Sequence, residues 1–317
     1  MKILIADSIA ASAATELKKE FEVVEQHYSS PELLIEIGKY HAIIVRSGTK
    51  LPREAIENGI QLKVIGRAGI GVDNIDVQAA TERGIFVVNA PTSSTISVAE
   101  MTIAFILALG RKIIHADKKT KRSEWPKKQL MGIELYGKLL GFVGCGRIGA
   151  EVVKRAQAFG MKCIVYDPYL PLEIFEKMGV ERTDSLNHLF RESDFVTIHA
   201  LLTDETRGMV SAKEFETMKS SAFIVNCARG GIIDEDALYD ALKEGKIAGA
   251  ALDVFTTEPA KENRLFELEN VYVSPHISAS TKEAQERAGN ITAEQVKLVL
   301  KGQKPKFCVN MKDLEQK

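Results

Sequence analysis

Five short apolar runs in the first 90 residues are typical of β-strands, and the segments between them have helical spacing. The predicted strands span residues 2–6, 21–25, 42–46, 62–65 and 85–88, and the predicted helices span 10–19, 31–39, 52–58 and 75–83. Ile43-Ile44-Val45 and Val64-Ile65 are continuously apolar, as expected of strands that are buried on both faces. The alternation predicts a parallel sheet with helices on both sides.

A long helical stretch at residues 97–121 leads to a second alternating region. Its first half is apolar on nearly all sides and its end is basic, which predicts one long helix buried against another surface, such as a second subunit. The second region contains predicted strands that begin at 139 and span 161–167, 195–199, 222–226, 248–254 and 271–274, with helices at 147–159, 186–191, 213–218, 235–243 and 282–300. The pattern predicts an α/β fold of two doubly wound parallel-sheet domains, which suits 317 residues.

A glycine-rich turn, Gly144-x-Gly146-x-x-Gly149, joins the strand at 139 to the next helix. In such a turn the first glycine permits a sharp bend, the second lets backbone N–H groups approach a pyrophosphate, and the third allows close helix packing. Asp167 ends the following strand about 20 residues further on, where a carboxylate binds a ribose 2′-OH. Glycine turns also serve as plain connections, but the flanking strands and the acid favour a dinucleotide site. No arginine adjoins Asp167 and Pro168, so NAD is expected rather than NADP.

The composition is that of an ordinary globular protein, with 45% hydrophobic and 27% charged residues. Lys and Arg number 42 against 43 Asp and Glu, so the charge predicts neither a nucleic-acid nor a membrane partner. The four cysteines lack the C-x-x-C spacing of zinc or redox pairs, which indicates a reducing cytoplasm and no metal site. The apolar run at 103–109 is far shorter than the roughly 20 residues of a membrane span.

Ligands of doubly wound sheets bind at the carboxyl ends of the strands, so the polar residues at those ends are candidates for chemistry. They are His199-Ala200, the segment from Cys227 to Gly231, Asp253, Glu258 and His276. A nicotinamide enzyme needs a proton carrier near neutral pH and a cation for an anionic substrate, and histidine, arginine and an acid form such a set. Alternatives remain: His199 suits a packing role, Arg229 a salt bridge and Glu258 a solvated loop. The four other histidines suit solvated or packing roles.

Four motifs together resemble the D-2-hydroxyacid dehydrogenase family and cover nearly the whole chain in order. They are the glycine turn, Asn226-Cys227-Ala228-Arg229-Gly230-Gly231, Ala251-Leu252-Asp253-Val254-Phe255 with Glu258-Pro259, and Pro275-His276-Ile277. The resemblance implies that His276 is the acid–base, that Glu258 pairs with its other ring nitrogen, and that Arg229 holds and polarises the substrate. It also implies cofactor contacts from Gly144, Gly146, Arg147, Ile148, Gly149, Asp167, Pro168, His199, Ala200, Thr206, Cys227, Ala228, Asp253, Ser278 and Ala279.

Within the family, residues 45–47 and 65–76 resemble members that oxidise 3-phosphoglycerate to 3-phosphohydroxypyruvate with NAD, the entry step of phosphorylated serine synthesis. The substrate contacts expected are Arg46, Ser47, Arg67, Ala68, Gly69, Ile70, Gly71, Lys127 and Arg229. Arginine suits bidentate contact with a phosphate, although Arg46, Arg67 and Lys127 also suit solvated positions. The alternative is a glyoxylate or hydroxypyruvate reductase or another D-2-hydroxyacid dehydrogenase, and a non-enzymatic NAD-sensing corepressor is a more distant one.

The resemblance also implies a domain arrangement. A flavodoxin-like substrate-binding domain is expected at residues 1–96 plus 283–317, with a Rossmann NAD-binding domain inserted at 97–282, and a homodimer built on the helix after Thr95. The family usually has a Gly-Asn pair where this chain has Ser93-Ser94, so the resemblance does not say which contacts that loop makes to a substrate. The chain ends at Lys317, so the C-terminal regulatory domains of longer members are not expected.

Overall fold

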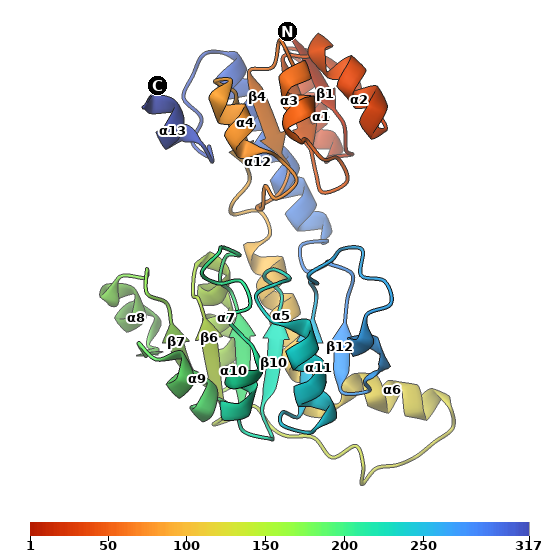
Figure 1. The fold of residues 1–317 in the computed structure, drawn as a ribbon, viewed down its shortest axis with the longest axis vertical. Coiled ribbons are helices and arrows are strands. Elements are labelled where there is room, and N and C mark those ends of the chain that lie inside the picture. Colours follow the sequence, from red (N-terminus) through yellow and green to blue (C-terminus); the bar gives the residue numbers. More distant parts are fainter. Residues whose placement is uncertain (317) are drawn as a thin grey trace. The chain divides into compact units, whose positions relative to one another are not determined.

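The computed structural model describes residues 1–316, which form two compact units (Figure 1). The first unit comprises residues 1–94 together with the segment from 279 onward, and the second comprises residues 95–278. Both boundaries fall a few residues earlier than the sequence predicted. The chain thus leaves the first unit, builds the second and returns.

The first unit is built on a five-stranded parallel sheet. Its order is β2 (Glu22–Glu25), β1 (Lys2–Ile5), β3 (Ala42–Val45), β4 (Val64–Arg67) and β5 (Phe86–Asn89). The order 2-1-3-4-5 is that of flavodoxin-like folds. Side chains alternate between the two faces of β1, with Ile3 and Ile5 in one core and Leu4 in the other.

Helices cover both faces of this sheet. One core contains α2 (Ser30–Glu36), α3 (Arg53–Asn58) and α4 (Val77–Glu82), and the other contains α1 (Ala11–Lys18) and the final long helix α12 (Lys282–Leu300). α12 lies so close to β4 that a Cβ on Gly66 would stand 2.8 Å from side-chain atoms of Thr292 and Val296. The returning chain therefore completes the core of the first unit. A short 3-10 helix η1 (Ile37–Lys39) follows α2, and α13 (Met311–Glu315) comes last.

The second unit contains a seven-stranded parallel sheet. Its order is β12 (Val271–Val273), β11 (Gly249–Leu252), β10 (Phe223–Asn226), β9 (Phe195–Ile198), β6 (Leu139–Val143), β7 (Lys162–Tyr166) and β8 (Glu181–Arg182). Counted from β6, this is the Rossmann order 3-2-1-4-5-6 with a seventh strand added at one edge. The predicted fold class, with two doubly wound parallel sheets, is confirmed.

Helices cover both faces of this sheet (Figure 1), and each face has its own core. Phe142 packs with α5 (Thr95–Arg111) and α7 (Arg147–Ala158), whereas its neighbour Val143 packs with α9 (Leu186–Glu192), α10 (Ala212–Thr217) and α11 (Glu235–Lys243). Four short elements of the chain were not predicted: α8 (Leu172–Met178), β8, the 3-10 helix η2 (Arg264–Glu267) and α13 of the first unit.

The prediction of one helix over residues 97–121 is wrong. α5 ends at Arg111, Lys112 has a left-handed φ of 52°, and α6 (Ile113–Lys121) follows in a new direction. A continued helix would use the Gly110 carbonyl to accept from residue 114, but here it accepts from the N–H of Ile133 at 2.8 Å. The returning loop thus ends the helix. Among residues 1–316, no helix has both the length and the apolar character needed to cross a bilayer.

Candidate active site

Five adjacent strands of the second unit place the candidate residues at one edge of its sheet. Val143, Ile198, Asn226, Leu252 and Val273 end β6, β9, β10, β11 and β12, and all five strands are parallel. The segments that follow them begin at Gly144, His199, Cys227, Asp253 and Ser274. The sequence candidates therefore gather at a single carboxyl edge.

The glycine turn has the geometry that a dinucleotide requires. Gly144 has a φ of 79°, and a Cβ there would stand 2.9 Å from the backbone nitrogen of Ala200. Nothing lies within 4 Å of the Cβ position of Gly146, so the backbone is open there, while a Cβ on Gly149 would stand 3.0 Å from the sulfur of Cys145. α7 begins at Arg147 and directs its N-terminal N–H groups toward this opening. The residues present fit a pyrophosphate.

Asp167 ties the end of β7 to the glycine turn. One carboxylate oxygen accepts from the N–H of Cys145 at 2.8 Å, and the other accepts from the N–H of Tyr169 at 3.0 Å. The Tyr169 hydroxyl in turn donates to Glu205 at 3.0 Å. A carboxylate held beside the turn fits the hydroxyls of a ribose, and the contact of Asp167 with the cofactor stays a prediction.

The buried cysteines do not act as nucleophiles. Burial raises the pKa of the Cys145 thiol and of the Cys227 thiol to about 12, so both stay protonated at neutral pH. The described residues also contain no cluster of three or more His, Cys, Asp or Glu side chains that suits a metal ion. Histidine, arginine and carboxylate residues at this edge are the candidates for its chemistry.

His199 is a packed, neutral residue. Its ring stacks on Phe142 with 5.9 Å between centroids, and its Nε2 lies 3.0 Å from the Thr197 hydroxyl. Part of the residue is reachable by solvent, yet the surrounding groups desolvate the ring and lower the pKa of His199 to about 4. A histidine with so low a pKa is a poor proton carrier at neutral pH, and its cofactor contact stays a prediction.

Replacing His199 with glutamine should make folding less sensitive to mild acid. Below its ordinary pKa of 6.5, the His199 ring takes up a proton in the unfolded chain, whereas the folded ring stays neutral down to about 4. The folded state therefore loses stability as the pH falls through this window, by about 2 kcal/mol at pH 5. Urea unfolding at pH 7 and pH 5 should show a larger loss for the parent than for His199→Gln. Equal losses of stability between pH 7 and pH 5 in the two proteins would contradict a lowered pKa of His199 in the folded state.

His276 and Glu258, two of the predicted catalytic residues, are in direct contact. His276 Nδ1 lies 2.7 Å from Glu258 Oε2, and the other carboxylate oxygen accepts from the N–H of Phe255 at 3.0 Å. The side chains are 47% and 36% exposed, so a small molecule can reach them. With Nδ1 engaged, Nε2 is the nitrogen that remains to exchange a proton with a substrate.

Arg229 lies in a loop that Asn226 shapes. The Asn226 amide donates to the Arg229 carbonyl at 2.9 Å and accepts from the N–H of Ala228 at 3.0 Å. Arg229 itself is half-buried, and one guanidinium nitrogen donates to the Ala228 carbonyl at 2.7 Å. No role was predicted for Asn226, although a buried polar residue at the end of an apolar strand is a usable signal.

In the first unit, the predicted substrate residues follow the neighbouring strands β3 and β4. The carboxylate of Asp7 accepts from the N–H groups of Arg46 and Thr49 at 2.6 and 3.0 Å, and Asn74 donates to the carbonyls of the same two residues at 2.7 and 2.6 Å. Side chains on both sides thus fix the loop that carries Arg46 and Ser47. The contacts of this loop and of residues 67–71 with a substrate stay predictions.

Ser93 and Ser94, which stand where the family usually has Gly-Asn, are both buried. The Ser93 hydroxyl donates to the Ala90 carbonyl at 2.8 Å, and Arg287 donates to the Ser93 carbonyl at 2.8 Å. The pair thus closes a turn inside the first unit.

Lys127 does not join the catalytic edge of its own chain, which corrects its assignment to the substrate site. It lies in the loop after α6, with its ammonium 5.9 Å from the ring centroid of Trp125. Its neighbours Pro126 and Gln129 line a cavity of about 460 Å³ together with Gly249, the first residue of β11, and Asn270, which precedes β12. This loop therefore lies at the amino end of the sheet, opposite His276.

Comparisons with known proteins agree with this geometry. Residues 103–278 match the family model described as D-isomer specific 2-hydroxyacid dehydrogenase, NAD binding domain. Proteins named D-3-phosphoglycerate dehydrogenase from Methanocaldococcus jannaschii and Archaeoglobus fulgidus are 54% and 48% identical over 100% and 99% of this chain, which spans only 60% of their length. The solved D-lactate dehydrogenase from Aquifex aeolicus, complexed with NAD and lactic acid, superposes with a TM-score of 0.86 at 30% identity, over 100% of this chain and 97% of that one.

The family model covers more than half of the chain, and the Aquifex structure is matched over nearly its whole length. Both agree with the resemblance found in the glycine turn, the arginine loop and the His276 segment. The chain belongs to the D-isomer specific 2-hydroxyacid dehydrogenase family.

Proposed function

We propose that this chain carries out the NAD-linked oxidation of 3-phosphoglycerate to 3-phosphohydroxypyruvate, as a D-3-phosphoglycerate dehydrogenase. The observation that carries the proposal is the contact of 2.7 Å between His276 and Glu258, at the same sheet edge as the glycine turn. The names of the longer relatives support the choice of substrate. The chain spans 60% of the length of these relatives, so we propose their activity for it and do not infer it from their names alone.

The chain's own residues account for the proton and the charges of such a reaction. When bound at the glycine turn and Asp167, NAD supplies the hydride acceptor. His276 Nε2 takes the proton of the C2 hydroxyl, and Glu258 holds the imidazole through Nδ1 and balances the positive charge that forms. The guanidinium of Arg229 binds the substrate carboxylate and polarises the developing carbonyl.

A substrate panel tests this function directly. NADH formation is followed with D-3-phosphoglycerate, D-glycerate, glycolate and D-lactate, and the reverse reaction with the corresponding keto acids. We expect D-3-phosphoglycerate to have the highest kcat/KM of the four acids. A preference for glyoxylate or hydroxypyruvate would instead indicate a reductase, and NADH binding without turnover of any acid would indicate a nucleotide sensor.

Arg46→Ala should selectively weaken use of the phosphorylated substrate. A charge-assisted hydrogen bond to a phosphate contributes about 1.5–3 kcal/mol, so kcat/KM for 3-phosphoglycerate should fall about 10–100-fold while that for an unphosphorylated acid changes little. Arg53→Ala is the control, because Arg53 lies in the same unit and is paired at the surface with Glu82. Equal losses for both substrate types would refute the role of Arg46 in phosphate binding.

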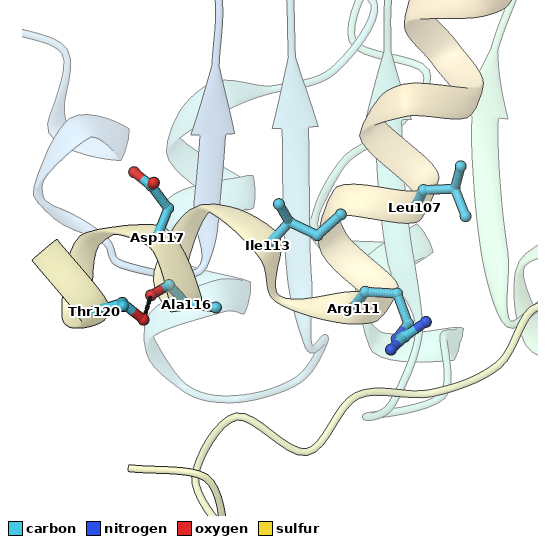
Figure 2. A pocket seen from close by; sticks show the side chains of 6 residues that line it. All are labelled: Leu107, Arg111, Ile113, Ala116, Asp117 and Thr120. Carbon is cyan, nitrogen blue, oxygen red and sulfur yellow. Dashed lines mark hydrogen bonds between the residues drawn. The ribbon is translucent and has the colours of Figure 1, made fainter. Parts of the chain in front are cut away.

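We also propose that two copies associate through the face formed by α5 and α6. A groove of about 600 Å³ there is lined by Leu107, Arg111, Ile113, Ala116, Asp117 and Thr120. Figure 2 shows these side chains. Exposed Trp125 and Met131 follow in the next loop. Apolar exposure of this extent favours association, and Arg111 and Asp117 give the face opposite charges that a two-fold contact can pair. The four cysteines form no disulfides, which supports a cytoplasmic location for this dimer.

Ile113→Asp is expected to convert the dimer to a monomer in light scattering coupled to gel filtration. Ile113 is 52% exposed and lines the groove, so a carboxylate there would be buried without a partner on association. Ile35→Asp is the matched control, since Ile35 is 76% exposed on the first unit. A parent protein that is already monomeric, or a variant that stays dimeric, would refute this interface.

A further inference from the structure

His276 has an unusual backbone conformation. Its φ is 53°, in the left-handed region that non-glycine residues rarely adopt, although histidine is less rare there than most. The direction of its Cα–Cβ bond, and so the position of the imidazole, depends on this conformation. Something must hold the segment in place, because relaxation to an extended backbone would carry Nδ1 away from Glu258.

The carboxylate of Asp253 accepts hydrogen bonds from both sides of His276. One oxygen accepts from the Ser274 hydroxyl and from the N–H of Ile277 at 2.8 Å, and the other accepts from the N–H of Ser278 at 2.8 Å. The Asp253 carbonyl also accepts from the N–H of His276 itself at 2.8 Å. Asp253 is fully buried, so these bonds are shielded from water.

The same residue leads into the segment that carries Glu258. Asp253 directly follows the last residue of β11, and two residues later the N–H of Phe255 donates to Glu258 at 3.0 Å. One buried carboxylate thus joins the chain that presents the imidazole to the chain that presents its partner. Among residues 1–316, the side chain that donates to this carboxylate is that of Ser274, so this bond can be removed without altering the backbone.

We propose that Asp253 and Ser274 form a positioning pair that holds His276 in its left-handed conformation, with Nδ1 on Glu258. The catalytic consequence rests on the proposed function, in which His276 carries the proton. In this arrangement the Ser274 hydroxyl donates to Asp253 and acts through the backbone of His276. Its loss should change the rate of the proton-transfer step and leave binding of the nucleotide intact.

Three variants test the proposal kinetically. Ser274→Ala should lower kcat about 10-fold or more, with the KM of the acid and the Kd of NADH within two-fold of the parent, and Ser274→Thr, which keeps the hydroxyl, should restore most of the rate. In a His276→Ala background, Ser274→Ala should cause no further loss, because residues that act as a unit are not additive. A full further loss in that background, or an unchanged kcat in Ser274→Ala, would overturn the proposal.

A second measurement does not depend on turnover. The proton between His276 Nδ1 and Glu258 should give a downfield NMR signal in the parent that is absent from His276→Ala. Ser274→Ala should shift or broaden this signal, and Ser274→Thr should retain it. A signal that is identical in Ser274→Ala overturns the positioning pair, whereas the expected shift in a protein that oxidises no 2-hydroxy acid supports the pair and refutes the proposed function.

Discussion

His276→Ala is expected to lower kcat by about 10²–10⁴-fold, the range found when a general acid–base is removed. His276 is exposed at the carboxyl edge and held by Glu258 at 2.7 Å, and the pKa of the other histidine at this edge, His199, is about 4. No second imidazole at the edge is therefore available to replace it at neutral pH. The measurement is NADH formation at saturating acid and cofactor.

The binding of NADH should not change in this variant, because the glycine turn and Asp167 lie on other strands. NADH fluorescence titration provides that check. His188→Ala is the matched control, since His188 lies on α9 in the same unit and its side chain is 39% exposed. If His276→Ala lost NADH binding together with turnover, the role of proton carrier would be wrong.

Much of the fold could be predicted because local signals agreed with tertiary packing. Continuous apolar runs such as Ile43-Ile44-Val45 identified strands buried on both faces, and the boundaries of α11 and α12 matched their helical patterns. The break at Lys112 could not be predicted. It depends on the Ile133 N–H reaching the Gly110 carbonyl, a contact between segments that no local pattern encodes.

The short strand β8 could not be predicted from the sequence for a different reason. β8 has two residues, and a window of that size is too short to establish a period. β8 pairs only with β7, and both of its residues are exposed. Its pairing with the edge of the sheet, rather than its own sequence, makes it a strand.

The sequence was enough to predict which segments meet at the site, because parallel strands place their carboxyl ends at the same edge of a sheet. The sequence could not reveal the supporting contacts. Asp253 was expected to touch the cofactor, but its hydrogen bonds to Ser274, Ile277 and Ser278 require the left-handed turn at His276. Lys127 was assigned from charge alone, and charge carries no information about which end of a sheet a loop reaches.

Gly230→Ala is expected to lower kcat/KM by about 100-fold or more, although it adds a single methyl group. A Cβ at Gly230 would collide with the backbone carbonyl of Phe255 and stand 2.6 Å from the backbone nitrogen of Thr256. Backbone atoms cannot rotate away as a side chain can, so one of the two loops must move. One loop carries Arg229 and the other carries Glu258, which is bonded to the N–H of Phe255. The collision therefore separates the cation from the His276 pair.

Gly110→Ala separates this effect from the general cost of an added methyl group. Its Cβ would stand 3.5–3.6 Å from side-chain atoms of Phe195, Ile133 and Leu135, which is ordinary contact, and it lies in α5, where alanine favours the helix by about 1 kcal/mol over glycine. This variant should keep full activity and unfold at the same or a higher urea concentration. Gly230→Ala should lose about 1–3 kcal/mol of stability, the usual cost of overpacking, and far more of its activity. The added methyl group leaves every catalytic side chain chemically intact, so a loss of activity would report on the spacing between the Arg229 and Glu258 loops. If Gly230→Ala kept the kcat/KM of the parent, this spacing would not control catalysis.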